Sequence, residues 1–138
     1  MLAAMIPIGM AMQSTGLSGL IASSISNIAP NLGQAWILII ILVITMAVSD
    51  IINNAATAVI MAPISYEIAL NFGYDVNAFL MVVAIGASCA FLTPIGHQCN
   101  TVVMGPGNYK FTDYWRIGLP LEILIVAIAI PMILFVWA

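Results

Sequence analysis

Charged residues are scarce in this 138-residue sequence: only 5% are Asp, Glu, Lys or Arg, whereas 64% are hydrophobic. A soluble domain carries about 25% charged residues, because its surface has to be wetted. So few charges cannot cover a water-facing surface, and we expect an integral membrane protein whose outer surface contacts lipid or other apolar protein. The sequence also lacks a run of basic residues, which excludes nucleic acid as a partner.

Cysteine and catalytic signatures are equally sparse. The two cysteines, Cys89 and Cys99, form no CxxC pair, and His97 with Cys99 gives two candidate zinc ligands without a third. We therefore expect free thiols and no zinc site. The sequence contains no HExxH, nucleophile-elbow or phosphate-loop pattern. These absences favour a protein that is not an enzyme and uses no cofactor; a membrane enzyme using Asp50 and His97 is the alternative.

The apolar sequence predicts helices of unequal length. Residues 1–13 begin in apolar sequence without a basic leader and are too short to span a membrane, which indicates a truncated helix. Residues 17–28 have the spacing of an uncharged amphipathic helix at the membrane interface. Only residues 117–138 are long enough to cross a core of about 30 Å unaided. The two cations, Lys110 and Arg116, precede this last helix, so the positive-inside rule places their loop in the cytoplasm.

Two further apolar segments are interrupted by polar residues. Residues 34–71 are predicted to form a re-entrant hairpin with its tip at 49–55 and arms of about 20 Å each. Residues 76–108 are predicted to form a broken helix, with the break at 93–100 around Pro94. Irregular backbone at membrane depth persists only inside protein or beside a wet cavity. Paired breaks of this kind indicate the substrate and ion site of an all-α secondary transporter.

The hairpin tip offers groups for both an anion and a cation. The carbonyls that end the first arm suit Na⁺, whereas the amides that begin the second, near Ala55 and Ala56, suit an anion. Asn53 and Asn54 supply amide oxygens for Na⁺, and Asn54 is also expected to contact the substrate. The alternative is that Asn54 simply caps the following helix.

The break offers a second set of polar groups. We expect Gly96 to share the Na⁺ with the tip, and His97 and Gln98 to meet the anion, unless His97 only hydrogen-bonds within its own loop. Asn100 is predicted to cap the second half of the broken helix.

Three polar residues are expected either to couple ion binding to transport or to have a structural role. They are Asp50, Thr57 and Asn100. A carboxylate at membrane depth is costly and usually functional, so Asp50 is either an ion ligand or a structural partner within the protein.

Several runs of the sequence resemble the divalent anion–sodium symporter family, a citrate transporter-like branch of the ion transporter superfamily. Residues 49–64 resemble that family's outer hairpin, and residues 87–101 its broken penultimate helix. The match continues through 105–109 and 111–120. The resemblance implies the C-terminal half of a permease, that is, the second of two inverted repeats, with the N-terminal repeat missing from this chain. It also implies a homodimer when full length, in a bacterial inner membrane.

The same resemblance assigns roles residue by residue. Asn54 falls on the asparagine of the family's Ser-Asn-Thr motif, which helps to hold Na⁺ and substrate, but Asn53 and Ala55 replace the serine and the threonine. His97 and Gln98 stand where the dicarboxylate carriers have Thr-Pro. The implied function is Na⁺-coupled transport of a small anion. The substrate is a dicarboxylate, or else sulfate or another small oxyanion. A non-transporting membrane subunit and a proton-coupled carrier or antiporter are the alternatives.

Overall fold

A computed structural model of the chain describes residues 33–137 without a gap, together with positions 7, 10–11, 14–16, 19–20 and 23–24. The helices expected at 1–13 and 17–28 therefore lie largely outside the described residues. Residues 33–137 form five helices: α3 (Gln34–Ile51), α4 (Asn54–Phe72), α5 (Val76–Ser88), α6 (Gln98–Met104) and α7 (Phe111–Trp137).

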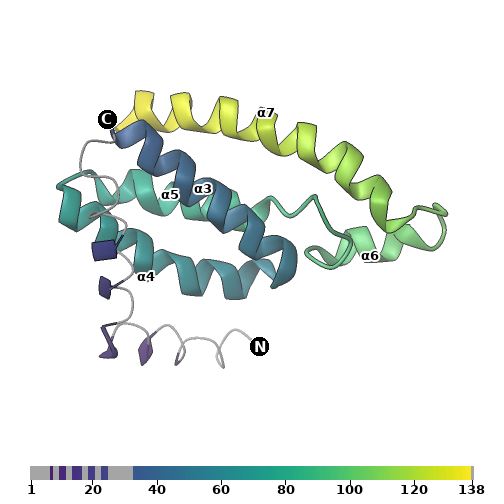
Figure 1. Cartoon of the computed structure of the whole chain (residues 1–138), viewed down its shortest axis with the longest axis horizontal. Coiled ribbons are helices and arrows are strands. Elements are labelled where there is room, and N and C mark those ends of the chain that lie inside the picture. Colours follow the sequence, from purple (N-terminus) through teal and green to yellow (C-terminus); the bar gives the residue numbers. More distant parts are fainter. Residues whose placement is uncertain are drawn as a thin grey trace.

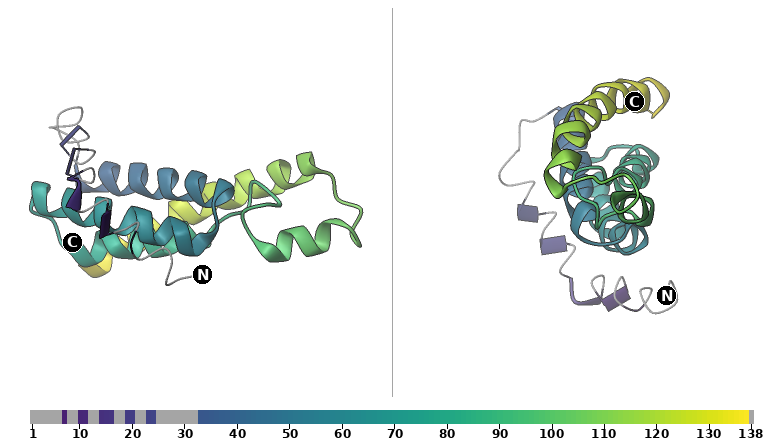
Figure 2. Two further views of the ribbon diagram at one scale, coloured as in Figure 1. Left: turned by 90° about the horizontal axis from the view of Figure 1, so that it is seen from below. Right: turned by 90° about the vertical axis from the view of Figure 1, so that its right-hand side faces the viewer.

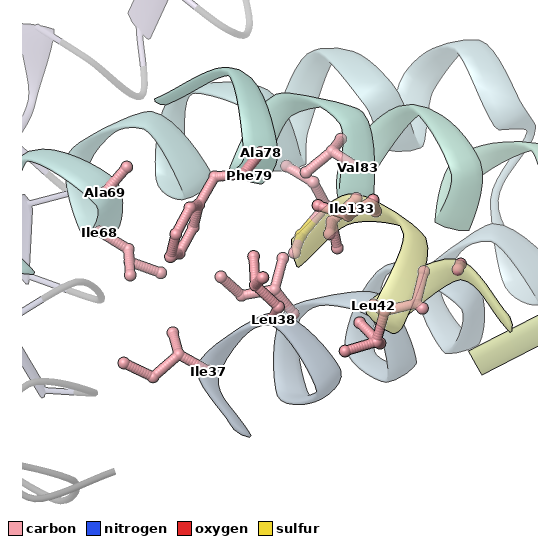
Figure 3. Close-up of a cluster of buried hydrophobic side chains, with 14 of the residues drawn as sticks. Ile37, Leu38, Leu42, Ile68, Ala69, Ala78, Phe79, Val83 and Ile133 are labelled. Atoms are coloured by element: carbon pink, nitrogen blue, oxygen red, sulfur yellow. The ribbon is translucent and has the colours of Figure 1, made fainter. Parts of the chain in front are cut away.

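Helix α5 is the centre of the bundle and packs against α3, α4 and α7. It lies between α4 and α7 in Figure 1. Apolar side chains from all four helices meet there, and Figure 3 shows Leu38, Ile68, Phe79 and Ile133 converging from α3, α4, α5 and α7. Phe79 is fully buried. This small core fixes α5, and with it the broken segment that follows.

The hairpin of α3 and α4 is longer and tighter than the sequence predicted. Its helices have 18 and 19 residues, which is roughly 27 and 28 Å at 1.5 Å per residue rather than the expected 20 Å. The expected tip at 49–55 contracts to Ile52 and Asn53, because Ser49 and Asp50 continue α3 instead of ending it. Both residues are buried, so their polar groups bond within the protein while the backbone stays helical.

The interrupted segment 76–108 is observed as two helices separated by irregular backbone. Helix α5 ends at Ser88 and α6 begins at Gln98, so the non-helical stretch is 89–97 rather than 93–100. Helix α6 and the start of α7 extend beyond the hairpin tip to one end of the molecule (Figures 1 and 2).

Helix α7 begins six residues earlier than predicted, at Phe111 instead of position 117. The Asp113 carboxylate accepts the backbone N–H of Lys110 at 2.8 Å, which is the reciprocal half of a capping box. Hydropathy does not detect such a polar first turn. Arg116 thus lies inside α7, and only Lys110 remains in the loop.

Three helices are long and apolar enough to cross a membrane within the described part of the chain: α3, α4 and α7. Helix α7 is mostly exposed along its apolar length. Such an exposed apolar surface belongs in lipid or against further protein. The chain is an integral membrane protein with an all-helical fold.

Candidate functional site

The hairpin tip is capped by Asn53. Its Oδ1 accepts the backbone N–H of Ala56 at 2.8 Å, so Asn53, and not Asn54, is the N-cap of α4. Of the first three amides of this helix, which have no intrahelical acceptor, that of Ala56 is therefore taken. The amides of Asn54 and Ala55 are left for another partner, and Ala55 is exposed.

The Asn54 side chain faces three oxygens from three parts of the chain. One end of its amide lies 3.0 Å from Ser49 Oγ, 3.2 Å from the Ala87 carbonyl and 3.3 Å from the Gly96 carbonyl. With its nitrogen turned inward, Asn54 donates to this group; with its oxygen inward, it accepts the Ser49 hydroxyl. Ser49 Oγ also donates to the Ala87 carbonyl at 2.8 Å. Asn54 therefore links the hairpin tip to both sides of the break.

The break packs directly on the end of α3. A Cβ added at Gly96 would lie 2.9 Å from the Ser49 carbonyl and 3.0 Å from the Asp50 Cα, so only glycine permits this approach. Thr93 secures the contact: its hydroxyl donates to the Asp50 carbonyl at 2.5 Å and accepts the Gly96 N–H at 3.1 Å.

Asp50 has a structural contact in this arrangement. It is 4% exposed, and its Oδ1 accepts the backbone N–H of Leu92 at 3.0 Å. The carboxylate thus satisfies an amide that the irregular backbone leaves unpaired. On α7, the Glu122 carboxyl lies beside it.

The second half-helix, α6, is capped by His97 and not by Asn100. His97 Nδ1 accepts the backbone N–H of Cys99 at 3.2 Å, and the residue is exposed. The Asn100 amide instead donates to the carbonyls of Ala90 at 3.1 Å and Thr93 at 3.3 Å. Asn100 therefore holds the break in shape, whereas Gln98 is exposed at the start of α6.

Thr57 is fully buried one turn into α4, and its hydroxyl has no hydrogen-bond partner. Both cysteines are free, with Cys89 buried and Cys99 exposed. Over the described residues, no three His, Cys, Asp or Glu side chains gather as a metal site.

A cavity of about 270 Å³ lies between α6 and the first turns of α7. Its walls are mainly apolar and aromatic, and include Val103, Tyr109 and Tyr114. None of Ser49, Asn54 or Gly96 lines it. The cavity is therefore separate from the junction around Asn54.

The sequence profile of one family matches the chain from residue 1 to residue 138, and that family is described as citrate transporter. The chain belongs to the citrate transporter family. This membership confirms that the protein is not an enzyme, and it agrees with the symporter resemblance at the level of the family.

The relatives of this chain within and around the citrate transporter family include proteins that are named as sodium-dependent carriers. It is 39% identical over 133 residues, or 96% of its length, to an uncharacterized transporter of Synechocystis, covering 22% of that protein. It is 30% identical over 93% of its length to sodium/sulfate cotransporter 2 of Chlamydomonas reinhardtii, covering 15% of it. It is 31% identical over 84% of its length to a sodium-dependent high-affinity dicarboxylate transporter of Caenorhabditis elegans, covering 21% of it.

The chain therefore spans about a fifth of the length of curated relatives such as the Synechocystis transporter. It therefore matches only part of the sequence that those relatives contain.

Three residues at the junction were not identified as functional from the sequence: Ser49, Thr93 and Glu122. A signal existed for Glu122, because it is the one charge inside the final apolar segment, and such residues usually face a functional interior. Ser49 and Thr93 carried no comparable signal. A hydroxyl next to a helix end is common. The hydroxyls of Ser49 and Thr93 acquire their hydrogen-bond acceptors only because the break packs on α3.

Proposed function

We propose that this chain forms half of the ion and anion site of a secondary active transporter that moves a small anion with Na⁺. The observation that carries the proposal is the junction at Asn54, where a side-chain amide, a hydroxyl and two carbonyls meet between a helix tip and a break. Two relatives are named as sodium-dependent carriers of sulfate and of dicarboxylates. We therefore take sulfate, dicarboxylates and similar oxyanions as the substrate class.

The Na⁺ is assigned to the oxygens around Asn54. When Oδ1 of Asn54 turns inward, it joins Ser49 Oγ and the carbonyls of Ala87 and Gly96 in an all-oxygen group. Oxygen ligands without a thiol suit a hard cation. The carboxyl end of α3, which carries partial negative charge, points at the same place. The Asn53 oxygen is engaged by Ala56, so Asn53 contributes the cap that holds Asn54 in position.

The anion is assigned to the other side of the tip. The amides of Asn54 and Ala55 lie at the positive end of α4, and exposed His97 and Gln98 follow Gly96 directly. The described chain brings neither Lys110 nor Arg116 to the tip, since both lie at the far end with the start of α7. Bound Na⁺ and the helix end must then balance the anion's charge, so affinity for the anion depends on Na⁺.

The hairpin is proposed to be re-entrant, as one repeat of an inverted-repeat transporter. Glu122 lies beside Asp50, and it stands roughly 16 Å from the start of α7 and 22 Å from its end at 1.5 Å per residue. If α7 spans the membrane, the hairpin tip next to its middle lies at membrane depth. We further propose that these residues are the second repeat of a homodimeric permease in a bacterial inner membrane, with the first repeat completing the site.

The test is uptake by proteoliposomes that contain the intact transporter to which these residues belong. Labelled sulfate, succinate and citrate are offered with inward Na⁺, with choline in its place, and with an inward proton gradient alone. Uptake that requires Na⁺ is the expected result. Uptake driven by protons without Na⁺ would assign the protein to the proton-coupled alternative, and no uptake of any anion would favour a non-transporting subunit.

Topology gives a first prediction. Because Lys110 and Arg116 flank the start of α7, we expect the α6–α7 loop to face the cytoplasm. Gly105→Cys is a suitable probe, since a Cβ there meets nothing within 4 Å. In a Cys99→Ser background, which removes the exposed native thiol, this cysteine should react in intact cells with membrane-permeant maleimides only. Labelling by an impermeant reagent from outside would reverse the orientation.

A second prediction separates the two roles of His97. His97→Asn preserves the cap of α6, since Asn is a favoured N-cap, but removes the imidazole ring. If the imidazole meets the anion, the pH profile of uptake or the ranking of anions should change in this variant and stay as in wild type for Asn71→Ala, an exposed position at the far end of α4. Superimposable profiles with the same ranking would restrict His97 to capping.

A further inference from the structure

The cavity of about 270 Å³ between α6 and the first turns of α7 has no part in the proposed function. Polar groups in its wall already bond to the protein. The Tyr114 hydroxyl donates to the Asn100 carbonyl at 2.7 Å, and the Asn100 amide donates to two carbonyls of the break. The Asp113 carboxylate accepts the Lys110 N–H at 2.8 Å. The walls therefore offer a ligand mainly apolar and aromatic surface, which suits hydrocarbon better than a hydrated anion.

The cavity follows α7 from the expected membrane interface toward the apolar interior. Its wall includes Tyr109, just before the helix, and reaches Leu121. The stretch of α7 from Phe111 to Leu121 rises roughly 15 Å at about 1.5 Å per residue. Trp115, exposed in the same turns, is the kind of residue that lies at headgroup level. Ile117 and Leu121 line the cavity and are themselves exposed, so the cavity is continuous with the apolar outer surface of α7. A hydrocarbon chain that runs inward from the headgroups takes the same course.

The two basic residues of the chain stand near the interface end of this cavity. Lys110 follows Tyr109 and Arg116 precedes Ile117 in the sequence, and both cations are exposed. They lie with the start of α7 at one end of the molecule (Figure 2). Asp113 is the one acidic residue between positions 105 and 121, so two positive charges and one negative leave this stretch with a net positive charge. Basic residues at this level of a membrane helix attract anionic lipid headgroups.

We propose that this cavity binds one acyl chain of an anionic phospholipid, whose headgroup lies against Lys110 and Arg116. The chain covers the apolar walls and the headgroup meets the two cations, so neither a neutral lipid nor a free phosphate makes both sets of contacts. Phe91 of the break and Gly118 of α7 also line the cavity, so the bound chain contacts α6, α7 and the break together. The site uses none of the groups around Asn54. It goes beyond the proposed function because it adds a lipid ligand that stabilises the break.

The test uses the purified intact transporter in detergent micelles, with phosphatidylglycerol that carries a photoreactive diazirine in one acyl chain. Illumination and peptide mapping should place cross-links on wall positions such as Val103 and Ile117. Unlabelled phosphatidylglycerol should compete about tenfold more effectively than phosphatidylcholine with the same chains, which is the order expected for two basic contacts. Glycerol phosphate, which is a headgroup without acyl chains, should not compete.

Two kinds of variant separate the chain from the headgroup. Val103→Trp fills the cavity and should abolish the cross-links, whereas Val102→Trp, at an exposed α6 position outside the wall, should retain them. Lys110→Gln combined with Arg116→Gln should keep the cross-links but lose the preference for phosphatidylglycerol. The melting temperature in lipid-free detergent checks that each variant folds. Ile117→Trp fills the same cavity from α7 and serves as a second filling variant.

Four results would overturn the proposal. The absence of cross-links at the wall positions in wild type would mean that another segment or protein covers the cavity. Equal competition by phosphatidylcholine would reduce the site to unspecific annular lipid. Competition by glycerol phosphate would make it an anion site without a chain. Unchanged cross-linking in folded Val103→Trp or Ile117→Trp would place the lipid elsewhere. None of these measurements needs Na⁺ or transport, so failure here is separate from failure of the proposed function.

Discussion

Asn54→Ala is expected to raise the Na⁺ concentration that half-activates uptake by roughly ten- to hundredfold. The amide faces Ser49 Oγ and the carbonyls of Ala87 and Gly96 at 3.0 to 3.3 Å, and alanine removes the one side chain that connects all three. A hydrogen-bonding group lost from a charged partner costs about 1.5–3 kcal/mol, and about 1.4 kcal/mol is a factor of ten in affinity. Uptake at rising Na⁺ concentration, with a saturating anion, measures the effect.

Asn71→Ala is the matched control, because Asn71 is exposed at the opposite end of the same helix. It should leave the Na⁺ dependence unchanged. Ser49→Ala should weaken Na⁺ activation in the same direction as Asn54→Ala, since it removes a second oxygen of the group. An Asn54→Ala transporter that folds, takes up anion and responds to Na⁺ like wild type would remove Asn54 from the site.

Gly118→Ala is expected to destabilise the protein and to abolish uptake. A Cβ at Gly118 would overlap the Phe91 carbonyl oxygen and lie 2.7 Å from its carbon and 3.1 Å from the Leu92 nitrogen. These are backbone atoms, so no side-chain rotation relieves the contact. Overpacking of this kind costs about 1–3 kcal/mol, which exceeds the roughly 1 kcal/mol that alanine gains over glycine in a helix. The helix must move off the break, and Glu122 moves with it.

The melting temperature of the intact transporter and its uptake rate measure this effect together. Gly105→Ala serves as the control, because its Cβ meets nothing within 4 Å, and it should behave as wild type. If Gly118→Ala melts at the wild-type temperature and transports normally, then α7 does not rest on the break as the structure places it.

Sequence alone sufficed for the membrane class and for the location of the two interruptions. Both depend on composition along the chain: too few charges to wet a surface, and polar residues inside apolar runs. It also singled out Asn54, whose side chain does stand between the tip and the break. Boundaries were less predictable, because Ser49 and Asp50 look like a helix end until their buried partners are known.

Tertiary structure alone decided which polar group meets which. Asn53 caps α4 although Asn54 has an equal propensity, and His97 rather than Asn100 caps α6, because the break turns Asn54 and Asn100 toward other carbonyls. The pairing of Asp50 with Glu122, 72 residues later, follows from the close approach of α7 to the break at Gly118. Local sequence encodes helix periodicity and capping preference, whereas contacts between distant segments depend on how the helices pack around α5.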